Sequence, residues 1–166
     1  FPVNGLLDDF NRRNGGLRHG THPWYGPEGL GGYKIDDHEV EVLGGGPIYW
    51  KNNPAFGKNQ EAFITFKEVD DEGREQDLLL KVQGNSPDWR KGAIEVLYDA
   101  RHNAVRVETF RPGNRRWTIY TNIPLTLNDG DQFGAQALSN GQVKIFKNGV
   151  LVGTVMLNTA DRAFFN

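Results

Sequence analysis

The chain has 166 residues, a length that suits one domain with a sizeable core, and we expect a single domain over residues 1–166. Its formal net charge of −2 gives no electrostatic reason to expect nucleic acid or an anionic membrane as a partner. The absence of cysteine excludes disulfides and thiolate metal sites, and no apolar run approaches the roughly 20 residues of a membrane span. We therefore expect neither nucleic-acid binding nor membrane insertion.

The sequence begins with Phe1-Pro2 and not with methionine, and it contains no signal peptide. Either a leader has been removed or the sequence is a domain cut from a longer protein. The first reading points to export, and we expect a secreted or cell-surface protein on that basis.

Short strands and a long loop are predicted in the first third of the chain. Gly5–Phe10 has the pattern of a first strand, with Leu6 and Phe10 directed to the core. Residues 17–32 show no periodicity and are rich in glycine and proline, which predicts a loop. Residues 33–35 and 38–43 then predict a strand pair.

Alternating apolar and polar residues continue through the rest of the chain and predict further strands separated by polar turns. The predicted strands are residues 61–67, 76–82, 93–98, 104–110 and 116–121. The last stretch, residues 131–156, predicts three consecutive antiparallel strands, because Ser139-Asn140-Gly141 and Asn148-Gly149 are both turn sequences. Together with 21 glycines and 8 prolines, this pattern predicts an all-β sandwich or barrel.

Several segments resemble lectin-type jelly-roll modules of secreted bacterial proteins. The hairpin Gly141–Gly153 is similar to the one near the end of concanavalin A-like and laminin-G-like domains. Four more segments resemble parts of such modules: Leu7–Arg12, Gly46–Trp50, Glu75–Gly84 and Gly92–Asp99. The resemblance spans nearly the whole chain and implies one lectin-like domain of all-β class, an antiparallel two-sheet β-sandwich of the concanavalin A-like jelly-roll type.

The same resemblance implies a structural calcium ion in many members. The usual site lies between the two chain ends, which here points to Asp8, Asp9 and Asp161 as calcium ligands. Two other acidic stretches, Asp70–Glu72 and Asp129–Asp131, are alternatives, and a solvated turn is the simplest reading of each.

Modules of this type usually continue beyond the position of Phe164-Phe165-Asn166 into a strand that lies beside the first one. Either the edge is closed in a different way, or the sandwich is one strand short at its C-terminal edge. An open edge exposes unpaired backbone groups and invites another strand. Self-association into an oligomer or filament, through strand complementation by residues 1–10, is accordingly an alternative function.

Tryptophan and tyrosine side chains are the candidates for sugar binding, because a pyranose stacks on an aromatic ring while nearby polar groups bind its hydroxyls. Aromatic residues on sandwich strands are more often part of the core. Loop positions therefore rank first, and the candidate ligand-binding residues are Trp24, Tyr25, Trp50, Trp89 and Arg90. The main functional prediction is a non-catalytic extracellular module that binds a polysaccharide or other glycan, or mediates surface adhesion.

A glycan-cleaving enzyme is the remaining alternative. Concanavalin-like glycanases carry a Glu-x-Asp-x-Glu motif on one strand, and this chain has Glu95 and Asp99 on one strand face. Leu97 replaces the central acid, which places an apolar residue between the two supposed catalysts. A carboxylate pair alone is a weak motif, so we predict that the chain is not an enzyme.

Overall fold

The computed structural model describes residues 5–18, 23–51 and 56–166, which form two compact units. Unit 1 contains Phe56–Gln83 and Asp88–Asn166, and unit 2 contains the described part of Gly5–Ala55 together with Gly84–Pro87. The single domain over residues 1–166 stays a prediction.

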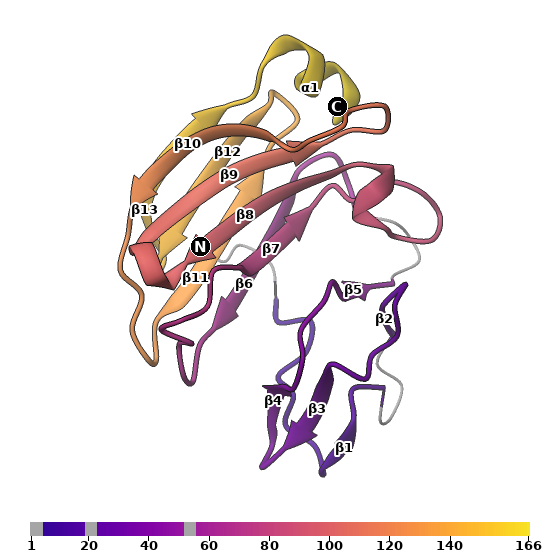
Figure 1. Ribbon diagram of the computed structural model, residues 1–166, viewed down its shortest axis with the longest axis vertical. Coiled ribbons are helices and arrows are strands. Elements are labelled where there is room, and N and C mark those ends of the chain that lie inside the picture. Colours follow the sequence, from indigo (N-terminus) through magenta and orange to yellow (C-terminus); the bar gives the residue numbers. More distant parts are fainter. Residues whose placement is uncertain (1–4, 19–22, 52–55) are drawn as a thin grey trace. The chain divides into compact units, whose positions relative to one another are not determined.

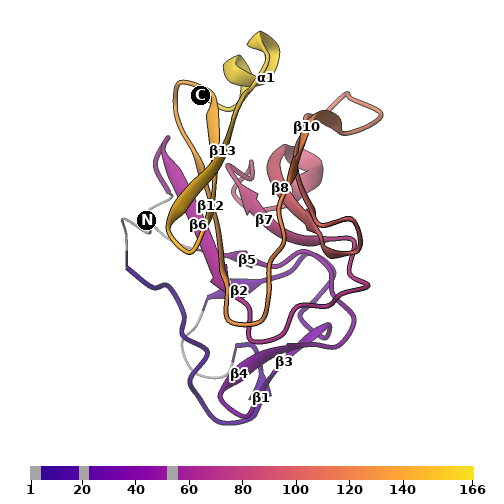
Figure 2. The same ribbon diagram turned by 90° about the vertical axis from the view of Figure 1, so that its left-hand side faces the viewer.

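Unit 1 contains two four-stranded antiparallel sheets (Figure 1). One sheet has the order β10-β9-β8-β7, with β7 (Gln76–Leu80), β8 (Ala93–Asp99), β9 (Ala104–Phe110) and β10 (Thr118–Pro124). The other has the order β13-β12-β11-β6, with β6 (Gln60–Thr65), β11 (Gln132–Ala137), β12 (Gln142–Lys147) and β13 (Val150–Met156). Figure 2 shows them as two layers.

A single apolar core lies between the two sheets. Inward-facing side chains of both sheets alternate with outward-facing ones and join one buried cluster. Tyr98 of β8 and Phe133 of β11 meet in it, with ring centroids 6.2 Å apart. The Tyr98 hydroxyl accepts a hydrogen bond from the Leu127 backbone N–H at 2.9 Å, so this buried polar atom has a partner. The predicted all-β, antiparallel two-sheet β-sandwich is confirmed.

The predicted three-stranded segment is also present. Asn148 and Gly149 both have positive φ, of 50° and 76°, and they connect β12 to β13 with Lys147 paired to Val150. Gly141, with φ of 85°, ends the turn between β11 and β12. Asn-Gly therefore has the turn role that its conformational freedom predicted.

A short helix, α1 (Thr159–Phe164), follows β13. A sandwich one strand short at its C-terminal edge stays a prediction. Its residue Asp161 is fully buried and accepts hydrogen bonds from the hydroxyls of Thr109, at 2.6 Å, and Tyr120. Arg111 pairs with the second carboxylate oxygen. These bonds attach the C-terminal helix to β9 and β10. Within the described ranges, no helix is both long and apolar enough to cross a membrane.

Unit 2 is built from short strands. β1 (Gly15–Gly16), β3 (Tyr33–Asp36) and β4 (Glu39–Val42) form one small sheet, and β2 (Trp24–Tyr25) pairs with β5 (Tyr49–Trp50). The predicted pair at residues 33–35 and 38–43 corresponds to β3 and β4. The predicted loop of residues 17–32 contains the two-residue strand β2. The sequence of this segment shows no periodicity, so it gave no indication of a strand.

The predicted first strand at Gly5–Phe10 is wrong. The Asp8 carboxylate accepts the Phe10 backbone N–H at 2.8 Å, and Phe10 has a positive φ of 55°. An aspartate side chain that bonds a backbone N–H two residues on competes with strand pairing, and here it produces a turn. Leu6 and Leu7 are exposed, and residues 1–4 lie outside the described residues. Strand complementation by residues 1–10 therefore stays a prediction.

Replacing Asp161 by alanine should destabilise unit 1 by about 3 kcal/mol or more, because the pair with Arg111 is lost and two hydroxyl groups lose their acceptor. Chemical denaturation followed by tryptophan fluorescence measures this change. Asp71→Ala, at an exposed loop position, is the matched control and should change stability by less than about 0.5 kcal/mol. Equal effects of the two substitutions would contradict the role given to Asp161.

Candidate functional site

The outer face of the β7–β10 sheet is the face that points away from the core. Its composition follows from the register of the hairpin formed by β8 and β9, in which Glu95 lies opposite Glu108. In the same register Leu97 lies opposite Arg106, and Ala93 lies opposite Phe110. Because side chains alternate along a strand, these residues share the outer face while their neighbours fill the core.

Three carboxyl groups, from Asp77, Glu95 and Glu108, lie at neighbouring positions on this face, and we call them the carboxyl cluster. Glu108 is directly opposite Glu95, and Asp77 of β7 is opposite Leu97, one diagonal step from Glu95. The Glu108 side chain is only 6 % exposed and forms an ion pair with Arg106. Three strands thus bring together acids that are far apart in the sequence.

The carboxyl cluster holds protons more strongly than isolated carboxyl groups do. Burial, followed by the charges of Glu108 and Glu75, raises the pKa of Glu95 to about 7, and Arg106 only partly opposes this. Burial also raises the pKa of Glu108, and burial with the charge of Glu95 raises the pKa of Asp77. The Asp77 side chain is exposed, so water screens part of this effect, and Glu95 is the group whose titration is most informative.

An aromatic cluster of Trp89, Phe110 and Trp117 lies at one end of the same face. Trp89 stacks on Trp117 with ring centroids 5.4 Å apart, and it meets Phe110 edge to face at 5.1 Å. Phe110 and Trp117 are 5.5 Å apart. All three rings are half-buried, so each keeps part of its surface in contact with solvent. Three packed rings form a rigid apolar surface next to polar groups.

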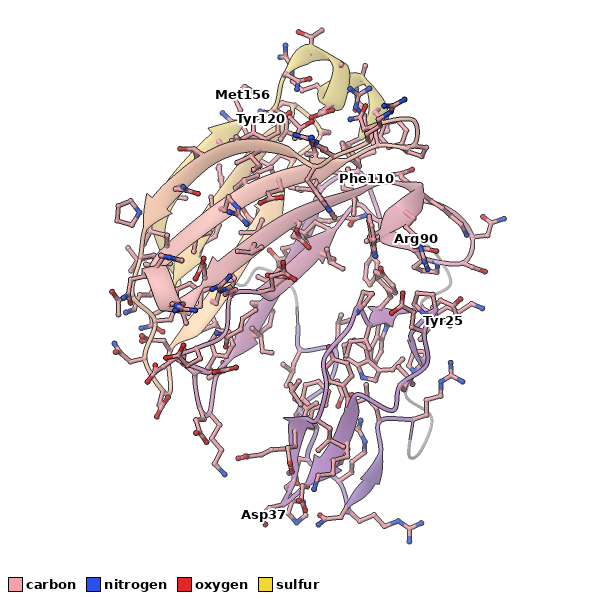
Figure 3. All side chains as sticks on the ribbon, viewed as in Figure 1. Tyr25, Asp37, Arg90, Phe110, Tyr120 and Met156 are labelled. Atoms are coloured by element: carbon pink, nitrogen blue, oxygen red, sulfur yellow. The ribbon has the colours of Figure 1, made fainter. Side chains whose placement is uncertain are left out.

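Trp89 is positioned by a short 3₁₀ helix, η1 (Trp89–Lys91), which connects β7 to β8. Asp88 caps this helix by accepting the Arg90 backbone N–H at 3.0 Å. The Arg90 guanidinium pairs with the Asp88 carboxylate at 2.9 Å and lies 6.0 Å from the centre of the Trp89 ring. Figure 3 labels Phe110 and Arg90 at this end of the sheet. The predicted residues Trp89 and Arg90 therefore belong to one local structure.

The other predicted ligand-binding residues, Trp24, Tyr25 and Trp50, belong to unit 2. Trp24 and Trp50 are cross-strand partners that meet edge to face, with centroids 5.3 Å apart. Phe10 stacks on Trp24 at 5.8 Å, and the indole N–H of Trp24 donates to Asp8 at 2.7 Å. These contacts place Trp24 and Trp50 in the packing of unit 2. Whether they bind a ligand stays a prediction.

The predicted calcium ligands divide between the units, with Asp8 and Asp9 in unit 2 and Asp161 in unit 1. Asp8 accepts hydrogen bonds from Arg12, Trp24 and its own turn, and Asp161 is bound by Arg111 and two hydroxyls. Within the part of the chain that the structure describes, no group of three or more histidine or acidic side chains is placed to hold a metal ion. Calcium at Asp8, Asp9 and Asp161 stays a prediction.

The proposed catalytic partner Asp99 has another role in this structure. It caps a second 3₁₀ helix, η2 (Ala100–His102), and its carboxylate pairs with the His102 imidazole at 2.7 Å. Burial acts to raise the pKa of Asp99, but the hydrogen bonds from His102 outweigh it and lower the pKa. The side chain between Glu95 and Asp99, Leu97, is 2 % exposed. Glu95 thus faces Glu108 across the strands, and an enzyme using Glu95 and Asp99 stays only an alternative.

Sequence reasoning missed Asp77, Glu108, Phe110 and Trp117 as neighbours of Glu95 and Trp89. A signal was present, because the polar turn after Asp99 predicts a hairpin whose partners are fixed once the turn length is known. That length was not evident, since the turn contains η2 and not a two-residue sequence such as Asn-Gly.

Comparisons with known proteins leave the family open. No protein-family model matches the chain, and a search of curated proteins also finds no match. Among solved structures, the carbohydrate-binding module CBM66 from Bacillus subtilis aligns with a TM-score of 0.44 and 17 % sequence identity. The alignment covers 61 % of this chain and 59 % of that one. A likeness at this level supports no conclusion about the function of this chain.

Replacing Glu95 by glutamine should stabilise the protein more at pH 8 than at pH 5. The pKa of the Glu95 carboxyl is 4.5 in the unfolded chain and about 7 in the folded chain. The unfolded chain therefore ionises first, and the folded state loses stability as pH rises between these two pKa values. The difference in unfolding free energy between variant and parent should grow by about 1–3 kcal/mol from pH 5 to pH 8. Denaturant titrations at both pH values measure it.

The control for this prediction is Glu68→Gln, at an exposed loop position before β7, which should follow the parent protein at both pH values. A Glu95→Gln difference that does not change with pH would show that Glu95 is already ionised at neutral pH in the folded chain.

Proposed function

We propose that the chain is a non-catalytic module that binds a glycan on the outer face of the β7–β10 sheet. The observation that carries this proposal is the aromatic cluster, because its three rings pack within 5.5 Å of one another beside a row of polar side chains. Sugars present an apolar ring face and hydroxyls at its edge, and this surface offers partners for both.

The rings supply the stacking surface. Trp89 and Trp117 are nearly parallel, with 25° between their planes, and each keeps solvent-accessible area. Because each ring is held by the other two, little side-chain freedom is lost when a sugar binds. A rigid aromatic platform binds at a lower entropic cost than flexible exposed side chains do.

Polar groups further along the face supply hydrogen bonds. Arg106 carries donors, the carboxyl cluster carries acceptors, and Asn122 of β10, which lies opposite Arg106, offers both. Arg106 is held by its pair with Glu108, so its direction is fixed before a ligand arrives. The spacing of cross-strand neighbours, about 5 Å, is similar to the length of a sugar unit.

Binding without cleavage is supported by the pairing of the acids. The buried Glu108 is paired with Arg106, and Asp99 caps η2 and pairs with His102, so both of these carboxylates are already engaged within the protein. Surface adhesion and an extracellular location both agree with glycan binding and form part of this proposal.

Trp117→Ala should reduce glycan affinity roughly 10-fold or more, because it removes half of the stacked pair. The parent protein is first tested against neutral oligosaccharides of glucose, xylose, mannose, galactose and N-acetylglucosamine. Calorimetric titration with the best of these then compares the parent protein, Trp117→Ala and Trp89→Ala, with far-ultraviolet circular dichroism as the check of folding.

Two controls make the result specific. Phe56→Ala removes an exposed aromatic side chain of unit 1 outside the cluster and should leave the affinity unchanged. Trp24→Ala removes a ring of unit 2. Loss of binding in Trp24→Ala with full binding in Trp89→Ala and Trp117→Ala would move the site to unit 2 and overturn the proposal.

A further inference from the structure

We propose that glycan binding on the outer face of the β7–β10 sheet is coupled to protonation of the carboxyl cluster, so that a neutral sugar is held more tightly at mildly acidic than at alkaline pH. This inference rests on the proposed function. It concerns the regulation of the same face and adds a property that stacking on the aromatic cluster alone does not have.

The outer face of the β7–β10 sheet carries more acidic than basic groups. Among the described residues, Arg106 is the cation whose charge acts on all three carboxyl groups, and it is already paired with Glu108. Within the described ranges, no hydrogen bond or ion pair reaches the carboxyl groups of Asp77 or Glu95. The next acid, Glu75, adds a further negative charge, and β10 presents only the uncharged Ile119 and Asn122 opposite Glu108 and Arg106. Arg106 therefore offsets only part of the repulsion between ionised acids on this face.

A neutral sugar bound on this face favours the protonated forms of Asp77 and Glu95. Asp77 is exposed and Glu95 is half-buried, so water still stabilises their charged forms in the free protein. A neutral sugar lying on the face displaces that water and brings no charge in return. Removing water disfavours the charged form of a carboxyl group, so the bound state takes up protons relative to the free state. By linkage, a ligand whose binding takes up protons binds more weakly as pH rises.

Hydrogen bonding also makes sugar binding stronger at low pH than at high pH. A carboxylate only accepts hydrogen bonds, whereas a protonated carboxyl group both donates and accepts. Sugar hydroxyls do both, so a protonated Glu95 finds a partner in either orientation. Burial, with the charges of Glu108 and Glu75, places the titration of Glu95 near pH 7, which sets the window between about pH 5.5 and 8.

A cationic ligand would reverse the sign. An amine-bearing sugar would pair with the ionised acids, release protons on binding, and bind more tightly as pH rises. The direction of the pH dependence therefore distinguishes the two classes of ligand.

The experiment is calorimetric titration of the full chain with the neutral oligosaccharide that binds best in the panel above, at pH 5.5 and pH 8.0. The dissociation constant should be about 3-fold to 10-fold higher at pH 8.0. Titrations at pH 7 in buffers of different ionisation enthalpy should show net proton uptake. Glu95→Gln should lose at least half of the pH dependence, and the control Glu68→Gln should keep all of it.

Each other outcome contradicts the inference. Equal affinity at both pH values with no proton uptake would overturn the coupling and leave the glycan site in place. Tighter binding at pH 8.0 would overturn the coupling for a neutral sugar. An unchanged pH dependence in Glu95→Gln would remove the carboxyl cluster as its cause. No binding to any oligosaccharide would overturn the proposed function, and the inference with it.

Discussion

The register of the β8–β9 hairpin is the constraint on which the binding face depends. Asp99 pairs with Ala104, and this one pairing fixes every opposite pair along the two strands. The turn is held by the Asp99 cap on η2 and by Asn103, which adopts a left-handed conformation with φ of 49°. A slip of one residue would direct Glu95 and Glu108 to opposite faces of the sheet.

The same register builds the core and the outer face at once. Val96 and Tyr98 enter the core between the sheets, and Glu95 and Leu97 point the other way. The apolar burial of the inner face stabilises the sandwich by far more than the electrostatic repulsion of the outer face destabilises it. The sheet can therefore carry an unfavourable charge arrangement outside, and such arrangements are typical of functional surfaces.

Much of the sandwich follows from alternation in the sequence, because a period of two identifies strands and their buried faces. Asn148-Gly149 even fixed one pairing in advance. Alternation does not state which strands pair or in which register. It therefore groups Glu95 with Asp99 on the same strand, whereas in the structure the residue opposite Glu95 is Glu108 of the neighbouring strand. The first predicted strand was wrong for a local reason, since the side chain of Asp8 captures a backbone N–H.

The candidate site, too, could be predicted from the sequence only in part. Trp89 and Arg90 could be chosen from a polar turn sequence, but the two rings that complete the cluster come from β9 and from the residue just before β10. Pairing between strands brings them together, and pairing is a property of the whole sheet. The exposed fraction of Trp24 was equally hard to predict, because its ring packs on other aromatic rings of unit 2.

The most direct test of the binding face is a nuclear magnetic resonance titration with an oligosaccharide that the protein binds. It follows the indole N–H signals of the four tryptophans as the oligosaccharide is added. Trp89 and Trp117 lie in the aromatic cluster, whereas Trp24 and Trp50 pack within unit 2. If the sugar binds on the aromatic cluster, the signals of Trp89 and Trp117 shift progressively and saturate together, while those of Trp24 and Trp50 stay in place. Shifts confined to Trp24 and Trp50 would contradict binding at that cluster.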